Sequence, residues 1–323
     1  MKKNNNCSRR EFLEKGALIG GLGFFGLPLL TTHLLNGEPA PPEKPAPDEP
    51  PADLTKTISV VSGDDPAKMT ALAIESLGGM ATFVKKDNVV VVKPNIAWER
   101  APELAATTNP EVVATIVREC LKAGAKTVKV FDRTCNESRR CYRTSGIEAA
   151  AKEAGAEVLF IGERESFYKE MPFPKKKVTW PIVKEALECD VLINVPIAKH
   201  HGLSKLTLGI KNLMGLMGGK RGEIHKELGL YLSDLLTVVK PHLTIIDAYR
   251  VLVSHGPTGG KPEYVKMARK IIAGVDPVAV DAYATTLPEF GLTPYDIEHI
   301  FTASENKLGE IDLKKIKIIE KTI

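Results

Sequence analysis

Short runs of apolar, largely β-branched residues recur along this chain, separated by segments of helical character. Val89–Val92 and Val191–Val195 have the length and composition of buried strands, and Val128–Phe131 is expected to be a further strand. Pro110–Ala123 carries apolar residues at helical spacing and is closed by Gly124. Strands that alternate with helices favour parallel pairing, because a parallel connection needs a crossover of about a dozen residues or more, usually a helix. The pattern predicts an α/β fold with a mainly parallel sheet and flanking helices.

The other elements extend this pattern. Asp276 followed by a proline is typical of a helix N-cap and first turn, so a helix is expected over Asp276–Leu287. The polar, proline-containing segment Glu163–Thr179 is expected to form an excursion or a lid, and Ile316–Glu320 an edge strand. An arrangement as two lobes around a central crevice stays open. We also expect helices over Gly146–Ala154, Tyr231–Val239 and Pro262–Lys270, and strands over Val158–Ile161 and Leu243–Ile246.

The N-terminal residues form a separate unit. Residues 8–15 read SRREFLEK and precede an uncharged segment, Gly16–Leu35, that is rich in glycine and leucine. The motif resembles the twin-arginine export signal at every defined position, and glycines in this number argue against a packed first helix. The resemblance implies export by the twin-arginine translocation machinery to the periplasm or another extracytoplasmic space. No A-x-A cleavage site is evident and the segment is about long enough to span a bilayer, so a cleaved signal and a membrane anchor both stay open.

Composition divides the chain into three parts. Residues 1–36 are the signal or anchor, residues 37–56 are a proline-rich acidic linker, and residues 57–323 are the α/β domain. The first 37 residues hold five Lys/Arg and two Asp/Glu, which leaves 39 basic against 38 acidic residues in the remainder. This near-neutral body argues against a nucleic-acid partner, and we expect membrane contact only through the N-terminal segment.

Polar residues follow several predicted strands directly. The carboxyl ends of parallel strands share one edge of a sheet, and ligands bind in the crevice there. We therefore expect these side chains to converge on one pocket and to bind a small anionic molecule. They are Lys93, Asn95, Asp132, Arg133, Lys199, His200, His201 and Asp247.

The segment from Cys189 to His225 carries the strongest candidates. After its strand come a lysine and two histidines at 199–201, and a helix is expected to begin at Ser204 as N-cap. Helical spacing would place Thr207, Lys211 and Gly215 on one face of that helix. Residues 218–222 read GGKRG, which predicts a mobile basic loop ahead of His225.

As catalytic groups we expect His201 to move protons, Lys199 and Lys211 to hold the anion, and Asp247 to orient or ligate. Lys211 as a solvated helical lysine and Asp247 as a strand-end turn residue are the alternatives.

The cofactor-binding candidates are Lys93, Asn95, Asn212, Gly256 and Gly259. The two glycines belong to the sequence HGPTGG at 255–260, whose backbone N–H groups could cradle a phosphate or carboxylate.

The metal candidates are His200, His225, Asp281, Cys135 and Cys141. His200 and His201 are adjacent and point to opposite sides of extended backbone, so at most one of them faces the pocket. Asp281 lies in an otherwise apolar helix, which asks for an explanation. Three readings of the two cysteines stay open: a disulfide, a shared metal or cluster, and a reactive thiol whose pKa nearby arginines lower.

Several motifs together resemble the family catalogued as DUF 362, a domain of unknown function. They are KPN at 93–95, the run from KHH at 199 to KNLMG at 211–215, HGPTGG at 255–260 and GVDPVAVDA at 274–282. The resemblance spans about Val89 to Leu287 and implies no settled reaction. Members are often labelled iron–sulfur proteins because many carry a ferredoxin-type module. This chain has no C-x-x-C-x-x-C run, so the cofactor stays unknown, with a metal or iron–sulfur centre left open.

Two functions of different classes fit these observations. The first is an exported enzyme or redox-associated protein that acts on a small anion at the sheet edge. The second is a non-catalytic, tethered binding or accessory protein that uses the same crevice. The convergence of many ionisable groups favours the enzyme, because such groups are costly to hold together without a use.

Overall fold

The computed structural model describes residues 53–323. The twin-arginine motif, the segment Gly16–Leu35 and most of the linker lie outside the described residues. Within 53–323, none of the helices combines the length and apolar character that crossing a bilayer would require. These residues fall within one compact unit, so the arrangement as two lobes is not what the chain adopts.

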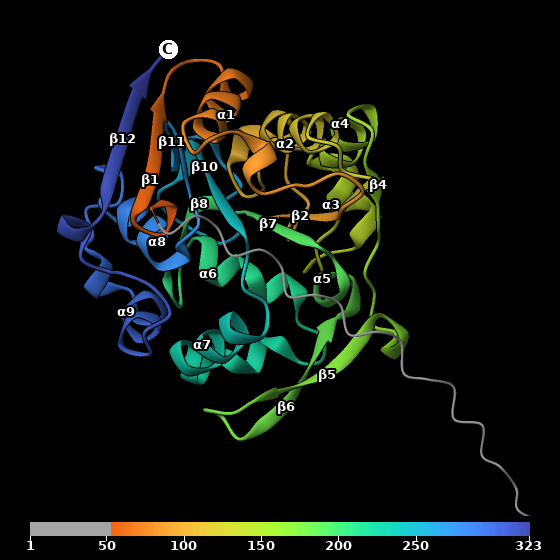
Figure 1. The fold of residues 1–323 in the computed structure, drawn as a ribbon. Coiled ribbons are helices and arrows are strands. Elements are labelled where there is room, and N and C mark those ends of the chain that lie inside the picture. The colour runs from red at the N-terminus through yellow and green to blue at the C-terminus, as the bar shows by residue number, and fades with distance from the viewer. Residues whose placement is uncertain (1–52) are drawn as a thin grey trace, which may run out of the picture. The chain divides into compact units, whose positions relative to one another are not determined.

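One large sheet organises the domain (Figure 1). Its strands run in the order β12-β1-β11-β10-β7-β2-β3-β4, and β8 and β9 branch from β10. Pairing is parallel except where β11 meets β1 and β10, and where β9 meets β8. The sheet strands are β1 Thr57–Ser62, β2 Val89–Pro94, β3 Thr127–Val130, β4 Glu157–Val158, β7 Val191–Val195, β8 Ile197–His201, β9 Lys205–Thr207, β10 Leu243–Leu252, β11 Val265–Gly274 and β12 Lys317–Thr322. The expected mainly parallel α/β fold is confirmed.

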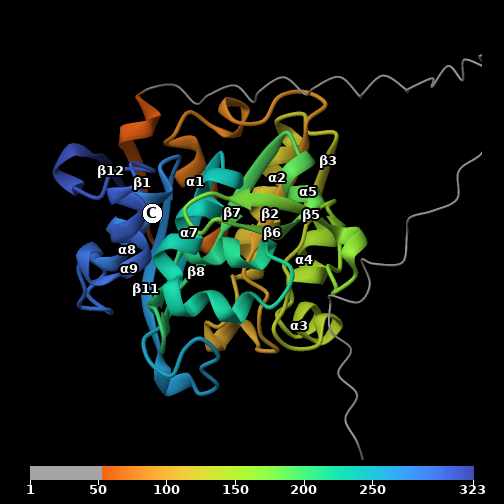
Figure 2. The same cartoon turned by 90° about the horizontal axis from the view of Figure 1, so that it is seen from below.

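Helices cover both faces of the sheet, as the side view and the view from below show (Figures 1 and 2). One face carries α1, α2 and α4, and the other carries α6, α7, α8 and α9. The helices are α1 Pro66–Glu75, α2 Pro110–Lys122, α3 Ser138–Thr144, α4 Ile147–Glu153, α5 Lys184–Glu188, α6 Gly209–Asn212, α7 Leu228–Val238, α8 Pro277–Thr285 and α9 Glu298–Glu305.

Alternate residues of the central strands enter two different cores. In β2, Val90 and Val92 pack with α1, α2 and α4, whereas Val91 packs into the core on the side of α7 and α8. All three are fully buried. A strand buried on both faces has no polar alternation, which is why the run of valines identified it so clearly.

Two expected helices are wrong. Pro262–Lys270 forms only a short 3-10 turn before β11, whose inner half is buried between β1 and β10. Arg269 has φ +51°, an irregularity that interrupts the two-residue alternation of a strand. Ser204 does not start a helix either: β8 and β9 form a hairpin there, so Thr207 lies on β9 and α6 begins only at Gly209.

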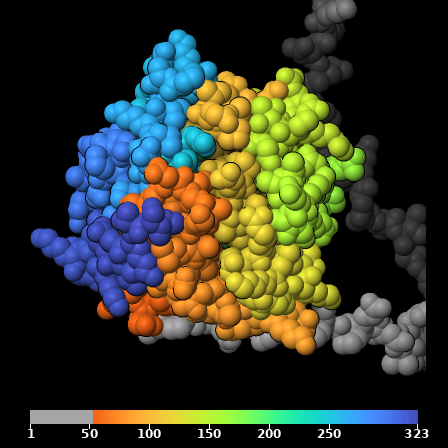
Figure 3. All heavy atoms as spheres, turned by 90° about the horizontal axis from the view of Figure 1, so that it is seen from above, coloured from red at the N-terminus to blue at the C-terminus, as the bar shows by residue number. Residues whose placement is uncertain are grey.

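The strand expected over Val158–Ile161 is only the two-residue β4, whereas the other expectations are closer to the structure. The segment Glu163–Thr179 contains strand β5, Tyr168–Phe173. This strand forms a two-stranded hairpin with β6, Val178–Val183, which continues beyond Thr179. The expected C-terminal edge strand is confirmed as β12, which pairs in parallel with β1. In the space-filling view the C-terminal segment (dark blue) lies directly against the segment that begins the domain (orange) (Figure 3).

Candidate functional site

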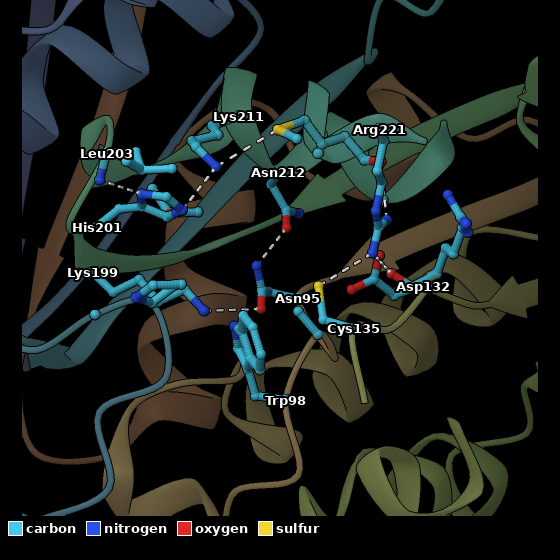
Figure 4. Close-up of a pocket in the computed structure, with 18 of the residues that line it drawn as sticks. Asn95, Trp98, Asp132, Cys135, Lys199, His201, Leu203, Lys211, Asn212 and Arg221 are labelled. Carbon is cyan, nitrogen blue, oxygen red and sulfur yellow. Dashed lines mark hydrogen bonds between the residues drawn. The ribbon is translucent and has the colours of Figure 1, made fainter. Parts of the chain in front are cut away.

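A pocket of about 410 Å³ lies at the edge where β2, β3 and β8 end (Figure 4). It brings together nine of the fourteen residues that were expected to be catalytic, cofactor-binding or metal-binding, together with Asp132 and Arg133, which were also expected at this edge; Trp98, Arg221, Thr207 and Met214 complete much of its wall. The nominated residues that line it are Lys93, Asn95, Cys135, Lys199, His201, Lys211, Asn212, His225 and Gly256. Those outside its lining are His200, Asp247, Gly259, Asp281 and Cys141.

A buried ion pair forms the floor of the pocket. Lys93 Nζ lies 2.8 Å from Asp132 Oδ1, and both side chains are almost completely buried. The same nitrogen donates to Asn212 Oδ1 at 3.1 Å, while Asp132 Oδ2 accepts the backbone N–H of Ile96 at 2.7 Å. Burial lowers the pKa of Lys93 and the Asp132 carboxylate opposes that shift. A Cβ at position 215 would overlap both charged groups, so Gly215 is what lets the next turn pass over the pair.

Side-chain amides connect this floor to the centre of the pocket. Asn95 Nδ2 donates to Asn212 Oδ1 at 3.0 Å, and Asn212 Nδ2 donates to Asn194 Oδ1 at 2.9 Å. Asn95 Oδ1 in turn accepts from Lys199 Nζ at 3.2 Å. Because each amide is oriented by partners on both its oxygen and its nitrogen, the network fixes their positions before any ligand binds.

Lys199 is a buried lysine that has no carboxylate partner within residues 53–323. Its Nζ donates to Asn95 Oδ1 and, at 2.5 Å, to the carbonyl of Ala106. Burial, helped by the repulsion of Lys211, lowers the pKa of Lys199 to about 7. A lysine with a pKa near neutrality can both attract an anion and exchange a proton.

His201 and Lys211 face each other across one end of the pocket (Figure 4). Lys211 Nζ lies 3.3 Å from His201 Nε2 and 3.6 Å from Met214 Sδ. Burial is the main cause that lowers the pKa of Lys211 to about 8 and that of His201 to about 3. His201 is therefore neutral at physiological pH.

His225 stacks on His201, with ring centroids 5.5 Å apart and an interplanar angle of 15°. Its Nδ1 lies 2.9 Å from the carbonyl of Gly222 and donates to it. Its Nε2 therefore holds a lone pair, and that atom is buried without a hydrogen-bond partner among the described residues. Burial also lowers the pKa of His225, which keeps the ring neutral.

Arg221 closes the opposite side of the pocket. Its guanidinium donates to the carbonyls of Met214, Arg133 and Thr134 at 2.7–3.1 Å and lies 3.4 Å from Cys135 Sγ. The sequence placed Arg221 only in a mobile loop. Its contacts with two different segments show instead that it joins the loop to the pocket wall.

Charge is not balanced in this pocket. Asp132 is paired with Lys93, and Arg133 forms an ion pair with Glu163 at 2.5 Å. Lys199, Lys211 and Arg221 form no ion pair with any residue in 53–323. The hydroxyl of Thr207 is also buried in the lining without a hydrogen-bond partner from that part of the chain. The site thus presents unpaired positive charge and an unused hydroxyl.

Two nominated carboxylates serve the backbone instead of the pocket. Asp247 accepts the N–H of Asn109 at 2.8 Å and that of Tyr249 at 3.0 Å. Asp281 accepts the N–H groups of Gly209 and Ile210 at 2.6 and 2.8 Å, so it caps α6. Burial raises the pKa of Asp247 to about 6 and that of Asp281 to about 7. Asp281 acts on the site indirectly, because α6 carries Lys211 and Asn212.

The remaining nominated groups do not assemble a metal site. His200 Nδ1 accepts the N–H of Gly256 at 3.0 Å, and Gly259 lies against Leu252. Among the residues that the structure describes, no three His, Cys, Asp or Glu side chains are arranged to hold a metal ion. A single thiol and two imidazoles set among lysines and an arginine do not fit an iron–sulfur centre, which needs four ligands that are mostly thiolates.

The cysteines stay separate. Cys135 and Cys141 are both free thiols, Cys135 exposed at the pocket and Cys141 buried in α3, so the disulfide reading does not describe this structure. Cys120 is buried in the core, whereas Cys189 is only partly buried.

The sequence analysis did not identify Trp98 or Met214 as residues of the site. Trp98 lies three residues beyond Asn95 and Met214 three beyond Lys211, so proximity to nominated residues was the available signal.

Comparison with known proteins finds a similar sequence and similar structures. A thylakoid-associated protein of Synechocystis is 28% identical over 265 residues, which cover 79% of this chain and 78% of that protein. The lactate racemase apoprotein of Thermoanaerobacterium thermosaccharolyticum superposes with a TM-score of 0.42 at 15% identity, over 70% of this chain and 55% of that one. A structural-genomics protein of Thermotoga maritima gives 0.38 at 11% identity, over 75% and 60%. This chain spans less than two thirds of either solved protein.

A family match covers most of the sheet and the whole pocket. The family described as Domain of unknown function (DUF362) matches residues 90–286, which is more than half of the chain. This segment includes every residue of the lining, from Lys93 to Pro257. The expected family is confirmed: the chain belongs to the DUF362 family.

Proposed function

We propose that this protein is an enzyme that binds a small organic anion in the pocket and exchanges protons with it. The observation that carries the proposal is the set of three basic side chains, Lys199, Lys211 and Arg221, that meet there without an ion pair among residues 53–323. Buried positive charge is costly unless something compensates it. A carboxylate or phosphate would supply the missing negative charge.

The groups around the anion are suited to proton transfer. Lys199 has a pKa of about 7, so it can give or take a proton near neutral pH. His225 offers an unpartnered Nε2 lone pair that can accept one. The pocket volume of about 410 Å³ fits a small molecule and not a polymer.

Calorimetry of the full-length protein against a panel of small carboxylates and phosphates tests the binding step. At least one should bind, and Lys199→Gln should weaken that binding about tenfold or more, in line with the loss of one charge-assisted contact. Lys152→Gln is the matched control, because Lys152 is an exposed lysine on α4. If no member of the panel binds, or if both variants behave alike, the anion pocket is wrong.

The enzyme and the accessory protein are separated by proton exchange. An enzyme of this kind should promote deuterium exchange from heavy water into a carbon-bound position of the bound ligand, read by NMR, and His225→Phe should slow it. Tight binding without exchange for every bound ligand would support the non-catalytic binding protein instead.

We also propose that the chain is exported by the twin-arginine pathway, on the strength of SRREFLEK at residues 8–15. Replacing Arg9 and Arg10 by lysine keeps the charge and removes the motif. Fractionation should then find the protein retained in the cytoplasm, and intact-mass analysis of the exported form should show whether Gly16–Leu35 stays as an anchor. Equal export of both forms would refute the proposal.

A further inference from the structure

The three unpaired basic side chains differ in what their nitrogen atoms meet. Lys199 donates to two oxygen acceptors and Arg221 to three carbonyls. These partners suit a charged donor. Lys211 Nζ meets no oxygen within residues 53–323; its partners are an imidazole nitrogen of His201 and the sulfur of Met214.

The tautomer of His201 decides what Lys211 must be. The backbone N–H groups of Leu203 and Ser204 lie 3.1 and 3.3 Å from His201 Nδ1 and donate to it. A ring nitrogen that accepts hydrogen bonds carries no proton, so the neutral ring has its proton on Nε2. This N–H points at Lys211 Nζ, which can accept it only through the lone pair of a neutral amine. Burial of Lys211 acts in the same direction, because it lowers the pKa of that side chain.

We propose that Lys211 is a nucleophile that forms an imine with a small aldehyde or ketone bearing a carboxylate or phosphate group. The inference rests on the anion pocket proposed above and names its substrate class. Lys199 and Arg221 would hold the anionic group, and that leaves the carbonyl facing Lys211. The contact with His201 Nε2 is long for a hydrogen bond, so rotation about the Cε–Nζ bond turns the lone pair into the pocket at small cost.

The reaction balances with the groups present. The amine lone pair forms the C–N bond while the carbonyl π pair moves to oxygen. Two protons leave the nitrogen and two protons reach the oxygen, relayed through the Nε2 lone pair of His225 and the amine of Lys199. The C–O bond then breaks with its electron pair on the oxygen, which departs as water, while the nitrogen lone pair forms the C=N bond. The products are the imine and one water molecule. No oxidant or reductant is required.

Reductive trapping on the full-length protein tests the imine. Glyoxylate is the carboxylate probe and dihydroxyacetone phosphate the phosphate probe, each with sodium cyanoborohydride at pH 7.4. Peptide mapping should find Lys211 carrying the mass of the probe less one oxygen atom. With a pKa of about 8, Lys211 holds on the order of a hundredfold more neutral amine at this pH than a lysine of ordinary pKa. Exposed lysines of the same chain are the internal comparison.

Lys211→Arg keeps a basic side chain at this position and cannot form an imine, so it should lose the adduct while still binding glycolate, which lacks the carbonyl. His201→Phe removes the donor that favours the neutral amine, so the labelling of Lys211 should require a higher pH. A shift of the pH profile would not follow from a merely structural role of His201.

The outcomes separate the two proposals. Glyoxylate that binds by calorimetry while Lys211 is labelled no faster than exposed lysines overturns the imine and leaves the anion pocket intact. An adduct on Lys199 in place of Lys211 also overturns it. If glyoxylate, glycolate and phosphate all fail to bind, the proposed anion pocket is refuted, and the proposed imine is refuted with it.

Discussion

Replacing Asp132 by asparagine should destabilise the fold by about 3–5 kcal/mol at pH 7, the range typical of breaking a buried ion pair. The amide of the new side chain keeps an oxygen for the N–H of Ile96 but leaves Lys93 without its counter-charge. The loss has a ceiling, since a fully buried Lys93 can shed its proton on folding. From an ordinary pKa of about 10.4, that release costs roughly 4.5 kcal/mol at pH 7.

Because Lys93 can release its proton, the predicted loss of stability depends on pH. In the variant the unfolded chain binds one proton more than the folded chain, so the free energy of unfolding rises with pH from 7 towards 10. The deficit relative to the parent should shrink by up to about 1.4 kcal/mol per pH unit. Adding Lys93→Met to the variant removes the stranded charge and should recover part of the loss at pH 7.

Urea denaturation followed by far-ultraviolet circular dichroism, at pH 7 and pH 9, measures both effects. Glu148→Gln is the control, because it breaks an exposed ion pair with Lys152 on α4 and should cost no more than about 0.5 kcal/mol. A loss below about 1 kcal/mol for Asp132→Asn, or a deficit that is equal at the two pH values, would refute the reasoning.

Binding of inorganic phosphate should weaken as the pH rises above the pKa of Lys199 in the complex, by up to tenfold per unit, because only the ammonium form attracts the anion; calorimetry of Lys199→Gln should lack this slope. Asp281→Asn sets an amide N–H against a backbone N–H at the start of α6, so it should lower the free energy of unfolding by about 1–3 kcal/mol and weaken phosphate binding, and unchanged values for both would contradict the capping role. Cys135, which is exposed, should react with a thiol reagent well before Cys141, whose burial raises its pKa to about 11; if neither reacts before reduction, the two are joined in a disulfide.

The sequence predicted the parts of the fold that depend on local composition. The buried strands β2 and β7 were evident because a strand covered on both faces is mostly apolar. β11 was missed because its outer half is exposed and irregular, and its strand character comes from pairing with β1 and β10. The hairpin of β8 and β9 was missed for a similar reason, since three-residue β9 has too little periodicity to read.

The sequence predicted those residues of the site whose positions follow from the topology of the sheet alone. Lys93, Asn95, Lys199 and His201 meet because strand ends in a parallel sheet share an edge. Asp247 and Asp281 were misread because their partners are backbone N–H groups far away in the sequence, at Asn109 and at Gly209. The sequence pattern does not show which backbone N–H groups need a side-chain acceptor. A carboxylate that accepts such hydrogen bonds therefore cannot be distinguished by sequence from a catalytic one.

The placement of β1 affects how the domain can be made. Within residues 53–323, β1 is the first strand to be synthesised, and its partners there are β11 and β12, more than 200 residues further along the chain. Until those strands are synthesised, Ile58 and Val60 have no neighbours in the sheet. Native closure of this edge must therefore wait until β11 and β12 have been synthesised, and a nascent chain stalled before β11 would expose an unpaired apolar strand to chaperones or aggregation.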